Sequence, residues 1–194
     1  MTARPEVPED YRELFSIDLQ KDKKLMLLVN LLALAIAAVL FVAGLLAVPI
    51  SALFDLESGL GAYILRFAAL VVGMIVYIFL HELVHGVFMR HFSGQKPHYG
   101  FTGIYAYAGS DACFDRRSYL VIALAPVVIW GLVLAVLAPL VPRSWFWVVY
   151  LIQIINLSGA AGDFYVTARF SRLPPDILVR DTGVSMTVFG PKEE

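Results

Sequence analysis

Four long apolar stretches constrain the fold of this 194-residue chain more than any other feature. They lie at about residues 25–48, 62–89, 119–141 and 145–162. A helix needs about 20 mostly apolar residues to cross about 30 Å of hydrocarbon, and each stretch is close to or above that length. Composition agrees, since 59% of the residues are hydrophobic and 16% are charged, against about 45–50% and about 25% in soluble domains. The sequence therefore predicts an all-α integral membrane protein with four transmembrane helices.

Charge and cysteine content exclude several classes of protein. A net charge of −1 supplies no basic field, so we expect the lipid bilayer, and not a nucleic acid, as a partner. Cys113 is the single cysteine, which excludes a disulfide scaffold. The first apolar stretch is too long, and begins too far from the N-terminus, to be a cleavable signal peptide.

Lysine and arginine in the flanks predict the orientation of the spans. Their number alternates as five, zero, four, one and four over the five segments outside the spans, beginning with the N-terminal one. Because positive charge favours the cytoplasmic side, both termini and the long middle loop are expected there. We therefore predict a multi-pass protein of a bacterial-type cytoplasmic membrane. Its parts are an N-terminal arm (1–24), a four-helix membrane domain (25–168) and a tail (169–194).

Three segments outside the spans carry local patterns. The arm has charges of both signs, and we interpret it as a short amphipathic helix. Aromatic residues separated by glycines at 98–113 favour a short β-hairpin in the middle loop, with an aromatic belt at the membrane interface as the alternative. In the tail, apolar runs on both sides of Asp181, Thr182 and Gly183 predict another hairpin, and an ordinary surface tail is the alternative.

Near the end of the second apolar stretch lies the sequence HELVHG, which contains His81, Glu82 and His85. Histidines four residues apart lie on one face of a helix, so both imidazoles can bind one Zn²⁺ ion. The glutamate beside the first histidine can then take a proton from a zinc-activated water. Ionisable side chains inside a span are rare and usually functional. The alternative is that the histidines cap the helix end while Glu82 pairs with Arg90.

A catalytic zinc site needs a third protein ligand and an open position for water. His91 would lie about 120° around the helix and about 9 Å further along from His85 if the helix continues, which is out of reach. Asp111 and Asp115 lie in the middle loop, where nothing in the sequence places them near the metal. Asp163 is the strongest candidate.

Two features favour Asp163. Gln153, Asn156, Ala160 and Asp163 lie on one face of the fourth span and make a partly polar stripe that leads to the carboxylate. Measured from the start of each span, Asp163 and His81 lie about 27 Å and about 28 Å along, at a similar depth. In the alternative interpretation, Asp163 only marks the point where the span meets water.

These motifs give the chain a family resemblance. HELVHG on one membrane helix, followed by NLSGAAGD on a later one, resembles the site-2-protease group of intramembrane zinc metalloproteases. The chain is more closely similar to the zincin-peptidase family of small bacterial membrane proteins. This resemblance implies a Zn²⁺ ion held by His81, His85 and Asp163, with Glu82 as general base. The pair Ala125 and Pro126 resembles a small-residue–proline element of the group.

The resemblance implies a membrane-embedded endopeptidase that cleaves a peptide or membrane-protein substrate near the cytoplasmic face. Asn156 is a candidate for substrate or oxyanion support. One alternative is a non-catalytic, metal-binding membrane scaffold or partner-binding protein, but such a protein would not need Glu82. Another is a metal transporter, which is disfavoured because the sequence has one ligand cluster and because Arg66 on the outer half would oppose cation entry.

Overall fold

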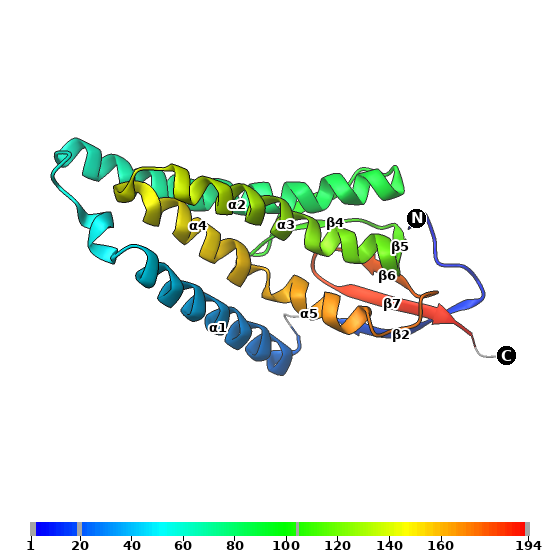
Figure 1. The fold of residues 1–194 in the computed structure, drawn as a ribbon. Helices are drawn as coiled ribbons and strands as arrows, with labels where there is room; N and C mark the ends of the chain where they lie inside the picture. Colours follow the sequence, from blue (N-terminus) through cyan, green and yellow to red (C-terminus); the bar gives the residue numbers. More distant parts are fainter. Residues whose placement is uncertain (1–2, 19–20, 104, 193–194) are drawn as a thin grey trace. The chain divides into compact units, whose positions relative to one another are not determined.

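The computed structural model describes residues 3–18, 21–103 and 105–192. Four helical stretches in these residues are long and apolar enough to cross a membrane, as the sequence predicts. The first three are α1 (Lys23–Ala47), α2 (Leu60–Ser93) and α3 (Arg116–Leu140), shown in Figure 1. A short 3₁₀ helix, η1 (Ile50–Phe54), lies between α1 and α2.

The fourth stretch is longer than predicted and is interrupted. It runs from Arg143 to Phe170 and consists of a 3₁₀ turn and two helices. These are η2 (Arg143–Trp145), α4 (Phe146–Gly159) and α5 (Ala161–Phe170). The break falls at Ala160, directly after Gly159, and glycine has a low helix propensity. Asp163 consequently lies in the first turn of a new helix, where the helix dipole favours a carboxylate.

The chain forms two compact units, and α1, α2 and α3 contribute residues to both. The first, here the sheet unit, contains Met1–Val29, His81–Pro126 and Gly162–Glu194. The second, here the helical unit, contains Asn30–Leu80 and Val127–Ala161. Residues of the predicted arm and tail therefore belong to the same unit as the HELVHG sequence.

The sheet unit contains a five-stranded antiparallel sheet in the order β1-β5-β6-β7-β2 (Figure 1). Its strands are β1 (Ala3–Arg4), β2 (Tyr11–Ile17), β5 (Cys113–Asp115), β6 (Leu178–Asp181) and β7 (Met186–Pro191). Strands β3 (His98–Phe101) and β4 (Ala106–Gly109) form a separate pair. Both predicted hairpins are confirmed, as β3–β4 in the middle loop and β6–β7 in the tail.

The amphipathic helix predicted for the arm is wrong, because the described part of this segment forms β1 and β2. Strand β2 pairs with β7 over its whole length, from Tyr11 opposite Pro191 to Ile17 opposite Met186. Ile17 is buried while Ser16 is exposed, which is the alternation of an edge strand. A short isolated helix is only marginally stable in water, whereas the edge of β7 offers hydrogen bonds to every second residue of β2.

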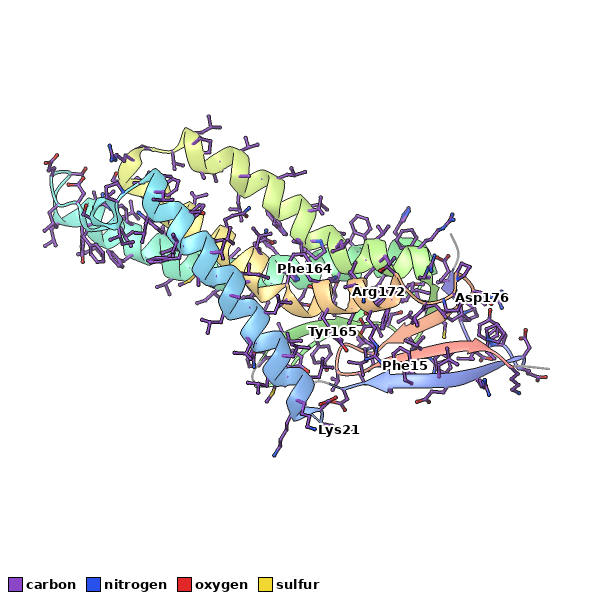
Figure 2. The ribbon with its side chains drawn as sticks, turned by 60° about the horizontal axis from the view of Figure 1, so that its bottom comes forward. Phe15, Lys21, Phe164, Tyr165, Arg172 and Asp176 are labelled. Carbon is purple, nitrogen blue, oxygen red and sulfur yellow. The ribbon has the colours of Figure 1, made fainter. Side chains whose placement is uncertain are left out.

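The sheet packs on α3 and α5 through a shared apolar core. Val179, Val188 and Phe170 are fully buried in it. Phe15 of β2 lies beside α5 (Figure 2). Its ring centroid is 6.2 Å from that of Phe170, and the Arg169 guanidinium lies over the Phe15 ring, 4.2 Å from the centroid. The sheet is therefore a packed part of the unit that carries the HELVHG helix end.

Several buried polar side chains of the helical unit form hydrogen bonds to neighbouring elements. Arg66 is 0% exposed, and its guanidinium donates a hydrogen bond to the Asp55 carbonyl that follows η1. The Tyr77 hydroxyl donates to Asn156 Oδ1 at 2.7 Å. Asn156 Nδ2 in turn donates to the Val127 carbonyl at 3.3 Å. These contacts join α2, α3 and α4 where water cannot satisfy the polar groups.

We expect Asn156→Ala to lower the free energy of unfolding by about 1–2 kcal/mol, because it leaves the Tyr77 hydroxyl and the Val127 carbonyl without these bonds. Denaturation of the purified protein in mixed micelles measures the loss. Asn30→Ala is the matched control, since Asn30 is an exposed residue of α1. Equal stability of the two variants would contradict the assigned network.

Candidate metal centre

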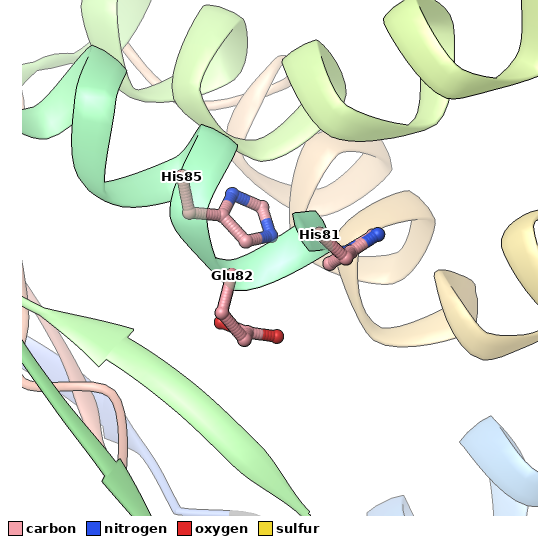
Figure 3. Close-up of side chains that lie close together, drawn as sticks. All are labelled: His81, Glu82 and His85. Atoms are coloured by element: carbon pink, nitrogen blue, oxygen red, sulfur yellow. The ribbon is translucent and has the colours of Figure 1, made fainter. Parts of the chain in front are cut away.

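His81, Glu82 and His85 lie in the second half of α2, within the sheet unit. Each histidine is 9% exposed. One potential ligand atom from each of the three residues lies within 4.8 Å of the other two, which makes this a group that could hold a metal ion. Figure 3 shows the two imidazoles beside each other on the helix, with the Glu82 carboxylate directed away from it.

Asp163 lies next to both imidazoles. Its Oδ2 atom is 3.5 Å from His81 Nε2, and its Oδ1 atom is 3.7 Å from His85 Nε2. Each carboxylate oxygen thus faces a different histidine. The Asp163 side chain is 22% exposed and those of the histidines are 11% exposed, so the cluster is largely buried but keeps some exposed surface.

The second nitrogen of His85 contacts a neighbouring helix. His85 Nδ1 lies 2.9 Å from the carbonyl oxygen of Ile122 in α3. This bond fixes the ring so that Nε2 faces Asp163.

The Glu82 carboxylate accepts a hydrogen bond from the β3–β4 hairpin. The Ala108 N–H donates a hydrogen bond to Glu82 Oε2 at 2.8 Å. Ala108 lies opposite Tyr99 in the pair. Because this N–H points to Glu82, it lies on the edge of β4 away from β3. The backbone of β4 therefore fixes the position of Glu82 Oε2 and does not fix that of Oε1 in the same way.

Gly86, the last residue of the HELVHG sequence, permits the close approach of the hairpin. A methyl group at this position would overlap the hydroxyl and ring of Tyr99. Tyr99 is the β3 residue opposite Ala108. The glycine therefore lets β3 pack against α2, and this brings the Ala108 N–H within reach of Glu82.

The other residues considered as ligands have different surroundings. α2 continues to Ser93, and His91 is exposed beside Phe92. Asp111 is exposed. Asp115 accepts hydrogen bonds from the backbone N–H and hydroxyl of Ser118, as a cap of α3 does. Asn156 belongs to the helical unit, so its suggested part in oxyanion support stays a prediction.

Asp181 is a buried carboxylate of the sheet unit that the sequence pattern did not single out. It is 8% exposed, accepts a hydrogen bond from the Tyr119 hydroxyl at 2.7 Å, and interacts electrostatically with His85 and Asp163. Burial raises the pKa of Asp181, although hydrogen bonds from Tyr119 and Gly183 oppose the shift. Its position beside Thr182 and Gly183 suggested only a solvent-exposed turn, because carboxylates are common there.

His81, Glu82 and His85 form a candidate metal-binding group, and the Asp163 carboxylate lies beside both imidazoles. Residues 74–178 match the family described as "Putative zincin peptidase", and the chain belongs to this family. The family name indicates a zinc metallopeptidase.

One curated relative is described as "Uncharacterized 24.7 kDa protein in gap 5'region", from Pyrococcus woesei. It is 30% identical over 122 residues, which are 60% of this chain and 53% of the relative. The chain thus spans about half the length of this relative. No solved structure matches the chain significantly.

We expect Gly86→Ala to lose the gain of about 1 kcal/mol that replacing a glycine within a helix normally brings, because the added methyl group must displace the half-exposed Tyr99 ring. Gly162→Ala in α5 is the matched control, since nothing lies within 4 Å of a methyl group there. The control should be neutral or stabilising, as expected of a glycine replaced within a helix.

Tyr99→Ala should rescue the stability of Gly86→Ala if the overlap is the cause. A double-mutant cycle of thermal unfolding in detergent measures this coupling. Additive losses from the two substitutions would show that the tight packing of β3 on α2 does not set the cost.

Proposed function

We propose that this chain is a zinc-dependent, membrane-embedded endopeptidase that hydrolyses a peptide bond near the cytoplasmic face. His81, His85 and Asp163 would hold the zinc ion, and Glu82 would act as general base. One observation carries the proposal: both oxygens of Asp163 face histidine Nε2 atoms, at 3.5 and 3.7 Å.

These two distances fit a shared metal ion better than direct hydrogen bonds. N–H···O bonds have donor–acceptor distances of about 2.7–3.2 Å, shorter than either separation. Ligand bonds of about 2.0–2.1 Å in a tetrahedral site place neighbouring ligand atoms about 3.3–3.4 Å apart. Two nitrogens and a carboxylate oxygen are also a donor set that zinc enzymes use, with the fourth position open to water.

Zinc held in this way supplies a Lewis acid that polarises a carbonyl group and makes water a better nucleophile near neutral pH. The chain's own part in the reaction is proton transfer by Glu82. Its carboxylate would take the proton of the attacking water and later deliver it to the leaving amine. The Ala108 N–H holds one carboxylate oxygen, which supports an orientation with the other oxygen turned to the water.

The edge of β4 supports a peptide as the substrate. On this edge the Ala108 N–H binds Glu82 and the Ser110 N–H binds the Asp181 carbonyl, and strand alternation directs the N–H of Ala106 outward in the same way. An extended peptide can add to such an edge through main-chain hydrogen bonds. It would then lie beside Glu82, with its scissile bond near the two histidines.

We place both termini and the centre on the cytoplasmic side. The five-stranded sheet supports a common side, since it pairs strands from the arm, the middle loop and the tail. Strands on opposite sides of a bilayer could not pair in this way. The excess of lysine and arginine in these three segments favours the cytoplasm.

The purified chain should bind about one zinc ion, and Asp163→Ala should lose most of this metal. Elemental analysis after dialysis in detergent measures the content. Asp111→Ala is the matched control, because it removes an exposed carboxylate of the same unit. Full zinc content in Asp163→Ala would remove this residue from the ligand set.

Glu82→Gln should retain the metal and lower peptide hydrolysis by about 10²–10⁴-fold, because an amide cannot accept the proton of water. Release of fluorescent peptides from labelled casein measures the rate, and zinc analysis of the same sample measures the metal. Unchanged hydrolysis would contradict the assigned base. Zinc binding without hydrolysis by the wild type would favour the metal-binding scaffold.

A further inference from the structure

A proline interrupts the hydrogen bonding of α3 close to the candidate centre. α3 is continuous from Arg116 to Leu140 and contains Pro126. Proline has no N–H, so the carbonyl four residues earlier, that of Ile122, receives no hydrogen bond from position 126. Ile122 is 1% exposed. A buried carbonyl without a donor is costly, and inside a membrane-spanning helix water does not supply one.

The missing donor comes from α2. His85 Nδ1 lies 2.9 Å from the Ile122 oxygen, across 37 residues of sequence and within the sheet unit. A carbonyl oxygen only accepts hydrogen bonds, so the proton of this bond belongs to Nδ1. The hydrogen bond thus pairs the Ile122 carbonyl, which lacks the N–H of position 126, with the buried imidazole of His85.

The bond has a chemical consequence at the other ring nitrogen. A neutral imidazole carries one proton, so a proton on Nδ1 leaves a lone pair on Nε2. His85 Nε2 is the atom that faces Asp163 Oδ1, at 3.7 Å. The Ile122 carbonyl therefore sets both the tautomer and the orientation that a metal ligand requires.

We infer that Pro126 is a positioning residue of the candidate centre. By withholding its N–H from Ile122, it keeps that carbonyl available to His85 and holds His85 in the Nδ1–H tautomer. The consequence for zinc affinity rests on the proposed function, whereas the tautomer itself can be observed without any metal.

The substitution Pro126→Ala tests this inference, because it gives the Ile122 carbonyl a second donor, the N–H of residue 126, which weakens or displaces the bond from His85. The first readout is the His85 tautomer in the zinc-free protein at alkaline pH, from imidazole nitrogen chemical shifts. The His85→Gln variant assigns the signal. We expect the Nδ1–H form in the wild type and a shift toward the Nε2–H form in Pro126→Ala.

The second readout is zinc affinity, measured by competition with a chelator. Loss of a hydrogen bond that orients a ligand typically costs about 10–100-fold in affinity, which is the decrease expected for Pro126→Ala. Pro139→Ala is the matched control, since it is the same substitution in the same helix, but in the helical unit. It should leave both the tautomer and the affinity unchanged.

Two results would overturn the inference. One is a wild-type His85 that carries its proton on Nε2, and this result needs no folded variant. The other is a Pro126→Ala protein that keeps both the Nδ1–H form and wild-type zinc affinity. A wild type with the Nδ1–H form that binds no zinc would overturn the proposed function while supporting the contact itself.

Discussion

The need to pair polar side chains among apolar helices organises the region around the candidate centre. The HELVHG sequence places two imidazoles and a carboxylate in a helix otherwise made largely of apolar residues. Three separate elements supply contacts to them. The Ile122 carbonyl of α3 contacts His85, the Ala108 N–H of β4 binds Glu82, and Asp163 of α5 faces both histidines. The groups that would do the chemistry therefore also tie these elements to α2, because leaving any of them unpaired would cost several kcal/mol.

The five-stranded sheet adds β-structure to the unit that contains the candidate centre, which a four-helix membrane protein need not have. β6 and β7 bring Asp181 and its neighbours into the unit that holds the centre. Residues of the arm form both edge strands of the same sheet, β1 and β2. The resulting unit combines one end of each span with all the described strands. This arrangement gives the centre a backbone N–H at Glu82 and a strand edge that a helical bundle alone lacks.

Local patterns predicted the elements well, and long-range pairing explains where they failed. The four spans follow from apolar runs, and both hairpins follow from aromatic or apolar runs broken by glycine. The arm was misassigned because its partner, β7, lies about 170 residues away in the chain, and neither segment shows the pairing by itself. The fourth helical stretch ends at Phe170, beyond the predicted end near residue 162, because the apolar run stops before Asp163 while the chain continues as α5.

For the site, the sequence alone predicted that His81 and His85 share one face of a helix with Glu82 beside them, because a spacing of four residues corresponds to about one helical turn. It also singled out Asp163 through depth and a polar stripe. The groups that surround these residues became known from the folded chain. Gly86 accommodates Tyr99, the Ala108 N–H reaches Glu82, and Pro126 frees a carbonyl for His85. Each of these three contacts joins segments that are separated in the sequence. Such contacts arise from packing, and no periodic pattern of residues in the chain predicts them.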